Sequence, residues 1–334
     1  MGLVRRIALI CLFLAAVGLT AVSWIVYQYA TSPAATNADV RIIEVPPGAG
    51  INTIARRLHQ QQLIKNPELF KYLALSQSRN ETIKAGEYRL SAAMSPLEII
   101  KKMTRGEVVL HKLTIPEGYT IRQIAALSAQ KGLSDRGAFL RMATSRATAE
   151  KMGINADTLE GYLFPETYFF PASAGAETII NAMVKRFHKI FTDHWERRAR
   201  EMGFSVHEIV TLASIVEKET AVDAERPLIA SVFHNRLKKN MRIESDPTVI
   251  YGIENFDGNL TRTHLNTRTP YNTYRIHGLP KGPIANPGEK SLEAVLYPAD
   301  TPYLYFVAKN DGTHKFSANL RSHNQAVRKY QLGR

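Results

Sequence analysis

Apolar positions are densest in the first thirty residues of the chain. Residues 7–27 carry no charge and are rich in Leu, Ile, Ala and Val, with aromatic side chains toward the far end. About 20 apolar residues suffice for a helix to cross the hydrocarbon core of a bilayer. Arg5 and Arg6 precede this run, and the next basic residue is Arg41. The positive-inside rule therefore predicts one membrane-spanning helix, with its N-terminus in the cytoplasm and the rest of the chain outside.

A cleaved signal peptide is the alternative interpretation of this run. Small residues at 32–35 could supply a cleavage site, but the apolar core of a signal peptide usually spans about 7–15 residues. We therefore favour a retained anchor. Both interpretations export most of the chain, which argues against nucleic acid as a partner. Because Cys11 is the only cysteine of the chain, an intramolecular disulfide is excluded. With a retained anchor, Cys11 would lie in the membrane.

Beyond this run, two similar segments start 70 residues apart. Each contains a β-branched stretch (41–45 or 112–115), a Pro-x-Gly turn and then a helical spacing of apolar residues. A further strand (86–90) and a helix that opens at Ser95 lie between them. This strand–turn–helix–strand order resembles the LysM module, a small βααβ fold associated with peptidoglycan binding. The alternative is a membrane-proximal spacer without affinity for glycan.

The rest of the chain mixes helical and strand-like patterns. Apolar residues at helical spacing predict helices over 137–149, 176–200 and 225–239. Two short stretches, 303–309 and 313–317, predict a β-hairpin. We therefore predict an α+β fold for the exported part of the chain.

Two irregular segments of this region have compositions that suit ligand binding. LEGYLFPETY (159–168) combines aromatic rings with two carboxylates, which is typical either of stacking on sugar rings or of a well-packed loop. Residues 245–288 are rich in Asn, Tyr, Thr and Pro, which is typical of a polar groove lined by loops.

The most informative segment is HEIVTLASIVEKET (207–220). At about 100° per residue, Leu212, Ile215 and Val216 share one helical face with Glu219. A carboxyl group on an apolar face has a raised pKa unless it is paired, and an acid that stays protonated near neutral pH can serve as a general acid. The alternative is that the apolar face of the helix ends at Val216 and that Glu219 is solvated beyond the last turn.

Composition narrows the range of partners. Hydrophobic residues make up 45% and charged residues 22%, which argues against a disordered chain. The chain has 43 Lys and Arg against 30 Asp and Glu, for a net charge of +13. An exported basic protein is suited to anionic lipid or to an acidic polymer such as a cell wall. The ten histidines show no close metal-ligand spacing, so we predict neither a metal nor another cofactor.

Several motifs together resemble the YceG-like family of endolytic murein transglycosylases. They are LEGYLFPETY (159–168), ASIVEKET (213–220), ERPLIASVFHNRL (225–237), SDPTVIYG (245–252), YNTY (271–274) and TPYLYFVA (301–308). The resemblance covers nearly the whole chain. It implies a single-pass enzyme of the cell inner membrane, with a LysM-like subdomain and a mixed α/β catalytic domain outside the cytoplasm. The expected limits are 1–6 for the cytoplasmic N-terminus, 7–29 for the membrane helix, 30–41 for a linker, 42–133 for the LysM-like subdomain and 134–334 for the catalytic domain.

The resemblance also implies the reaction and its partners. The family cleaves the β-1,4 bond between N-acetylmuramic acid and N-acetylglucosamine within nascent glycan strands, without water, and leaves 1,6-anhydro ends. The resemblance further implies that the protein acts beside glycan polymerases such as penicillin-binding proteins and terminates strand growth. A muramidase-type hydrolase and a non-catalytic peptidoglycan-binding scaffold are the alternatives.

Residue roles follow from the same resemblance. The second glutamate of EKET, here Glu219, is the expected catalytic residue. Further polar residues of the motifs are candidates for substrate binding, and some of their carboxylates could supply the second acid or base that a hydrolase needs. These candidates are Glu166, Glu217, Asn235, Asp246, Thr248, Tyr251, Tyr271 and Asn272.

Overall fold

An uninterrupted helix, α1 (Gly2–Thr31), opens the computed structural model, which describes residues 2–36, 39–77 and 82–333. It extends the helix predicted over 7–29. Thirty residues at 1.5 Å each give about 45 Å, more than the ~30 Å hydrocarbon core of a bilayer. Its apolar side chains are exposed, and α1 is long and apolar enough to cross a membrane. Met1 and residues 37–38 of the predicted N-terminal segment and linker lie outside the described residues.

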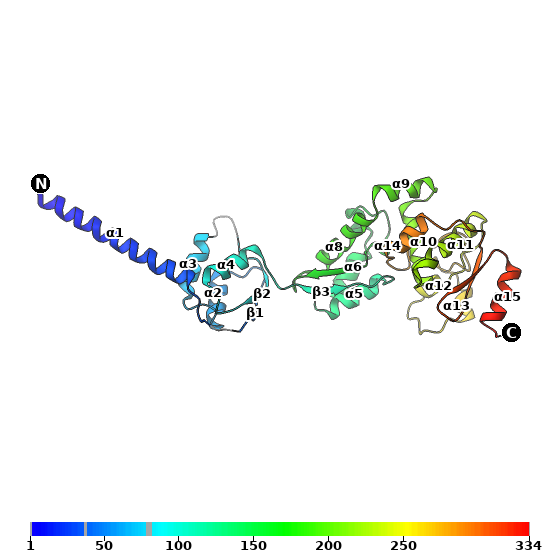
Figure 1. The fold of residues 1–334 in the computed structure, drawn as a ribbon, viewed down its shortest axis with the longest axis horizontal. Helices are drawn as coiled ribbons and strands as arrows, with labels where there is room; N and C mark the ends of the chain where they lie inside the picture. The colour runs from blue at the N-terminus through cyan, green and yellow to red at the C-terminus, as the bar shows by residue number, and fades with distance from the viewer. Residues whose placement is uncertain (1, 37–38, 78–81, 334) are drawn as a thin grey trace. The chain divides into compact units, whose positions relative to one another are not determined.

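The chain divides into two units (Figure 1). The first contains the residues up to His111 together with Phe169–Ser173, and the second contains Lys112–Tyr168 and the residues from Ala174 onward. The predicted boundary between the LysM-like subdomain (42–133) and the catalytic domain (134–334) does not coincide with this division. The second strand–turn–helix segment belongs to the second unit, because its helix packs on the helix that follows it.

The first unit has a β–α–α–β order, followed by one more helix. Its two strands pair antiparallel, with Arg41 opposite Leu90 and Val45 opposite Gly86. Fully buried Leu58, Phe70 and Ile99 come from three different helices of its core. The last turn of α1 joins this unit, because Ala30 is buried there and the Tyr29 hydroxyl donates to the carbonyl of Asn66 at 2.6 Å. The elements are β1 (Arg41–Val45), α2 (Ile51–Gln60), α3 (Pro67–Gln77), β2 (Gly86–Leu90) and α4 (Pro96–Arg105).

The two Pro-x-Gly turns have the same backbone geometry. Gly48 and Gly118 have φ of +77° and +74°, a left-handed conformation that glycine adopts without steric penalty. Helix α2 follows the first turn, and α5 (Ile121–Gln130) follows the second. A capping box between Thr120 and Gln123 fixes the start of α5. The repeat predicted from the sequence is therefore a repeat of local structure.

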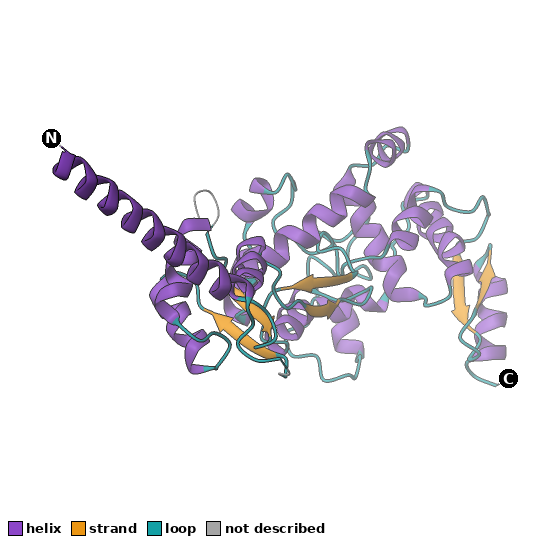
Figure 2. Cartoon of the chain, turned by 60° about the vertical axis from the view of Figure 1, so that its left-hand side comes forward, coloured by secondary structure: helices purple, strands orange, loops and turns teal. Residues whose placement is uncertain are grey.

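The second unit is largely helical, with short strands in pairs (Figure 2). The helices predicted over 137–149 and 176–200 are each divided into two shorter helices. Ser145 caps a new helix after a break at Thr144, and the other break falls at Phe191 and Thr192. The elements are β3 (His111–Thr114), α5, α6 (Arg136–Ala143), α7 (Arg146–Lys151), β4 (Thr167–Phe170), α8 (Gly175–Ile190), α9 (Asp193–Glu201), α10 (Val206–Glu219), η1 (Asp223–Glu225), α11 (Arg226–Lys238), α12 (Asp246–Tyr251), α13 (Arg262–Asn266), α14 (Glu289–Leu296), β5 (Tyr305–Ala308), β6 (His314–Ser317) and α15 (Leu320–Tyr330).

Helix α10 is the centre of the second unit. Every residue from Ile209 to Val216 is buried, because α11 and α14 pack against it (Figure 1). The expectation of a one-sided apolar stripe was wrong for this reason. The hydroxyls of Thr211 and Ser214 are buried as well, and each donates to a carbonyl of α10 itself, at 2.7 Å.

Candidate active site

Glu219 is the last residue of α10, at the point where the buried helix reaches a cavity. A capping box between Ser205 and Glu208 begins the helix, and the extended backbone of Thr220 ends it. The cavity has a volume of about 430 Å³. Side chains from α10, α11, α12, the β5–β6 hairpin, α15 and the loops at 243–244 and 274 line it, among them Glu219, Arg236, Asp246, Tyr274, Phe306 and His314.

The surroundings of Glu219 favour its protonated form. Burial raises the pKa of this carboxyl group, and the nearby negative charge of Asp246 acts in the same direction. The hydroxyl of Ser245 donates to Oε1 of Glu219 at 2.5 Å and opposes the shift, as do the more distant charges of His314 and Arg236. The expected pKa shift is therefore present, and Glu219 is not a solvated residue beyond the end of its helix. Such a group can donate a proton near neutral pH.

Two further carboxylates line the same cavity, and of these Glu244 is paired with Arg236 at 3.1 Å whereas Asp246 has no cation as a partner among the described residues. Asp246 is exposed at the start of α12, and the Tyr274 hydroxyl donates to its Oδ1 at 2.7 Å. Arg236 is the main cation there, but four neighbouring oxygens occupy its guanidinium group, including the carbonyls of Leu304 at 2.7 Å and Ile243 at 2.9 Å. Arg236 therefore ties three segments together beside the cavity.

Glu217 faces another part of the molecule. Its carboxylate lies 3.4 Å from the guanidinium of Arg226, and the two side chains are only 6% and 5% exposed. It also accepts hydrogen bonds from the backbone of Gly288 at 3.0 Å and from the hydroxyl of Ser291 at 2.7 Å. Glu217 therefore fastens α10 to α11 and α14.

Two other predicted binding residues are wholly buried. Thr248 donates to the carbonyl of Ser245 at 2.6 Å, and the amide of Asn272 donates to three carbonyls of the α13 segment. With no exposed surface, they shape the loop that carries Ser245 and Asp246. Asn235 donates to two carbonyls at Thr301 and Tyr303, and exposed Glu166 forms an ion pair with Arg186.

Tyr251 and Tyr271 line a second cavity of about 1150 Å³. Their rings meet edge to face, with centroids 4.8 Å apart. The other walls come from the start of α5 and from the segment between α12 and Tyr271. Aromatic side chains in a large cavity of mixed polar and apolar lining are suited to an extended ligand with sugar rings.

Glu160 is a buried acid that our sequence analysis did not select. It is 4% exposed and accepts hydrogen bonds from the backbone of Ile121, the amide of Asn286 and the hydroxyl of Tyr251, each at 3.0 Å. Burial raises its pKa to about 7. The available signal was its position within the apolar run LEGYLF, whereas Glu166, which we selected, lies on the surface.

Gly161 explains how Glu160 can be so deeply buried. Its φ is +90°, and a Cβ at this position would lie 2.6 Å from Pro283 and 2.7 Å from Val210. Only glycine lets the chain approach α10 this closely.

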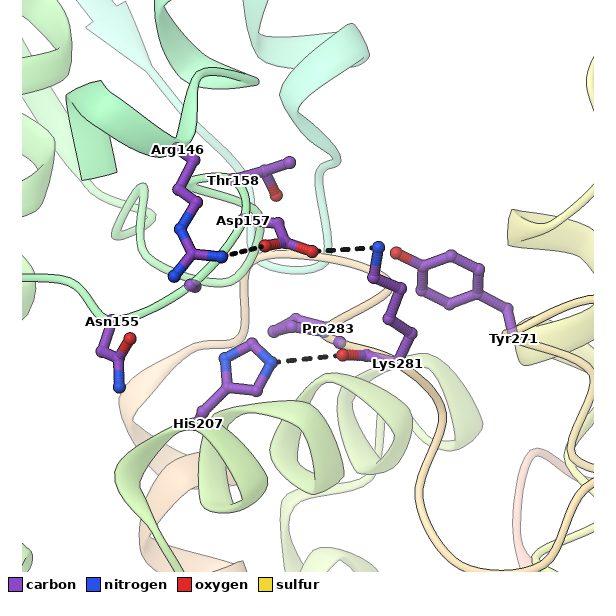
Figure 3. Close-up of a pocket in the computed structure, with 10 residues that line it drawn as sticks. Arg146, Asn155, Asp157, Thr158, His207, Tyr271, Lys281 and Pro283 are labelled. Atoms are coloured by element: carbon purple, nitrogen blue, oxygen red, sulfur yellow. Dashed lines mark hydrogen bonds and ion pairs between the residues drawn. The ribbon is translucent and has the colours of Figure 1, made fainter. Parts of the chain in front are cut away.

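A third cavity, of about 250 Å³, lies on another part of the second unit (Figure 3). Asp157 stands at its centre, 2.9 Å from the ammonium of Lys281 and 3.5 Å from the guanidinium of Arg146. One ring nitrogen of His207 is 2.9 Å from the hydroxyl of Tyr162, and the other is 3.3 Å from the carbonyl of Lys281. The charged groups of this cavity therefore satisfy one another. Within residues 2–36, 39–77 and 82–333 there is no cluster of three or more His, Cys, Asp or Glu that could hold a metal ion.

Comparisons with known proteins agree on one family. Residues 43–329 match the YceG-like family. An endolytic murein transglycosylase of Bacillus subtilis (strain 168) is 35% identical over 309 residues, which are 86% of this chain and 84% of that protein. A protein of the same name from Streptococcus pneumoniae serotype 2 (strain D39) is 30% identical over 317 residues, 85% of this chain but only 57% of that protein. The crystal structure of a YceG-like protein from Listeria monocytogenes is 36% identical, with a TM-score of 0.60, over 86% of this chain and 99% of that one.

Proposed function

The chain belongs to the YceG-like family, and on this basis we propose that it is an endolytic lytic transglycosylase of peptidoglycan. It cleaves the β-1,4 bond between N-acetylmuramic acid and N-acetylglucosamine within glycan strands and leaves 1,6-anhydro ends. One observation carries the assignment of its chemistry. Glu219 lies at the edge of a cavity, and the pKa of its carboxyl group is raised. Its hydrogen-bonding partner is a hydroxyl group and not a cation.

Glu219 acts twice in this reaction. As an acid it protonates the glycosidic oxygen, and the bond from that oxygen to C1 of the muramyl residue breaks. As a carboxylate it then takes the proton of the muramyl 6-hydroxyl while that oxygen bonds to C1. One carboxyl group suffices because the nucleophile belongs to the same sugar, which gives it a high effective concentration.

The alternative hydrolase needs a second carboxylate at a suitable distance, about 5–5.5 Å for retention or 6.5–9.5 Å for inversion. Glu217 is bound to Arg226, and Glu166 is bound to Arg186. Asp246 shares the cavity with Glu219. The hydrolase hypothesis therefore depends on Asp246.

The same proposal assigns roles to the rest of the chain. Helix α1 anchors the protein in the cell inner membrane with its N-terminus in the cytoplasm. The first unit is a LysM-like module that binds glycan, supported by its β–α–α–β order. The net charge of +13 attracts the protein to anionic lipid and to the carboxylates of wall peptides. The enzyme works beside glycan polymerases and ends strand growth.

Mass spectrometry of digested peptidoglycan tests the proposed reaction. The full chain should release anhydro-muropeptides, whose mass is lower by one water than that of hydrolysed products. Glu219→Gln should release anhydro product at least about 10²-fold more slowly, while Glu293→Gln, which also removes one negative charge but at an exposed position of α14, should behave as the parent chain. Hydrated ends would instead identify a hydrolase. Binding to sacculi without new chain ends would identify a scaffold.

A further inference from the structure

His314, which lines the cavity of Glu219, is bound to a buried acid, Glu225. Glu225 ends η1, and His314 begins β6, 89 residues later. One carboxylate oxygen of Glu225 accepts the backbone N–H of His314 at 2.8 Å, and the other lies 2.7 Å from its ring Nδ1. The two side chains are only 11% and 12% exposed.

This contact determines which ring nitrogen is available to a ligand. An ionised carboxylate only accepts hydrogen bonds, so Nδ1 of His314 carries the proton that it donates to Glu225. Nε2 is the remaining nitrogen. It has no hydrogen-bonding partner in the described part of the chain, and His314 lines the cavity that Glu219 enters. The ring of Phe306 packs edge to face against the imidazole, with centroids 5.4 Å apart, and restricts it further.

A purely structural role explains only half of this arrangement. The bond from Glu225 to the backbone of His314 would by itself fasten the β5–β6 hairpin to the start of α11. The second bond fixes the rotation of the imidazole, which the hairpin does not require. Orienting a histidine ring through a carboxylate at Nδ1 is useful when the opposite nitrogen meets a ligand.

We propose that His314 binds a sugar hydroxyl of the glycan through Nε2, in the cavity of Glu219, and that Glu225 is the positioning residue that sets the ring. This inference rests on the proposed function, since it takes the occupant of the cavity to be peptidoglycan. With Nδ1–H held by Glu225, the ring presents Nε2 to the cavity, where it accepts a hydrogen bond from a sugar hydroxyl when the ring is neutral and donates one to the hydroxyl oxygen when the ring is protonated. His314 thus holds the sugar in register with the acid group of Glu219.

Two substitutions of the histidine separate substrate contact from structure. Asparagine at 314 can keep the bond to Glu225 but has nothing at the position of Nε2, whereas glutamine can place its amide oxygen there. We expect His314→Asn to lower kcat/KM for release of anhydro product by about 10–100-fold, and His314→Gln to recover at least half of that loss on a logarithmic scale. His277→Asn, at an exposed histidine, is the matched control and should leave kcat/KM unchanged. Equal losses in His314→Asn and His314→Gln, or no loss in either, would overturn the substrate contact.

Glu225 is tested through its coupling to His314. Glu225→Gln should lower kcat/KM in the parent chain but add little in the His314→Asn background, because it acts through the ring. Additive losses would instead indicate an independent structural role and would contradict the positioning role. The nitrogen NMR signals of the His314 ring should show the Nδ1–H tautomer in the parent chain and a different state in Glu225→Gln.

A binding measurement keeps the test valid if a variant does not fold. Soluble glycan fragments added to Glu219→Gln, which retains His314 and Glu225, should shift the Nε2 signal of His314. Binding without that shift would overturn the inference. The proposed reaction is judged separately by whether the parent chain forms anhydro ends, so failure of one proposal is distinguishable from failure of the other.

Discussion

Glu217 and Glu219 stand two residues apart on α10, yet their surroundings are opposite. Two residues turn a helix by about 200°, so the side chains leave it on opposite faces. Glu217 enters a closed interface and has a guanidinium and two other donors as partners. Glu219 enters a cavity, where its nearest donor is the neutral hydroxyl of Ser245.

The difference shows how one helix can supply both a structural and a reactive carboxyl group. The buried guanidinium of Arg226 and two neutral donors occupy the carboxyl group of Glu217 and make it part of the packing between helices. At Glu219 the partner is a hydroxyl group, and burial favours the protonated over the charged form of the carboxyl group. The negative charge of Asp246 favours the protonated form further. The type of partner therefore separates the two roles more clearly than burial does.

The largest effect should follow from Glu219→Gln. Loss of a general acid lowers the rate by about 10²–10⁴-fold. Since the raised pKa means that the folded state holds this proton more tightly than the unfolded chain, the stability that Glu219 contributes is present at low pH and is lost as pH rises through its folded pKa. Glu219→Gln should therefore be at least as stable as the parent chain at pH 8, as measured by urea unfolding. A variant that loses activity and stability together would place Glu219 in the same class as Glu217.

Glu217→Ala should produce the opposite pattern. It leaves the buried guanidinium of Arg226 with the half-exposed carboxylates of Asp223 and Glu117 and the hydroxyl of Ser291 as partners, so we expect the free energy of unfolding to fall by about 3 kcal/mol. Turnover per folded molecule should change much less than in Glu219→Gln. Denaturant titration and active-site-normalised rates give the two values. Loss of turnover at unchanged stability would instead assign Glu217 to the chemistry.

Glu160 extends the comparison to a buried carboxyl group whose hydrogen-bonding partners are neutral. Its pKa of about 7 lies above the ordinary value of 4.5, so its contribution to stability is complete below about pH 4.5 and is lost as pH rises toward 7. The total change is of the order of 3 kcal/mol. Glu160→Gln should remove this pH dependence and should be the more stable chain at pH 8. Parallel stability–pH curves for the two chains would contradict the raised pKa.

The smallest of these effects belongs to Ser245→Ala. The Ser245 hydroxyl opposes the pKa shift of Glu219, so its removal should raise that pKa further. The basic limb of the kcat/KM profile should move to higher pH with it. Thr248→Ser, at a buried hydroxyl of the same segment that does not contact Glu219, is the matched control. An unmoved limb would mean that another group titrates there.

Periodicity located Glu219 because a helix repeats within a few residues. It could not show that α10 is covered on every side, because that depends on α11 and α14, which come later in the chain. The partners that define each carboxyl group are also distant in sequence: Ser245 lies 26 residues from Glu219, and Ser291 lies 74 residues from Glu217. Local patterns carry no information on such pairs. For the same reason Thr248 and Asn272 looked like groove residues, although they are buried supports of the loop.

The junction between α1 and the first unit has a mechanical consequence. The helix does not end in a free tether, because Ala30 is buried in the core of that unit and Tyr29 is bonded to Asn66. If α1 spans a bilayer, as we propose, a tilt of the helix is passed on to the first unit. The hydrocarbon thickness around the helix would then set the angle at which this unit stands above the membrane.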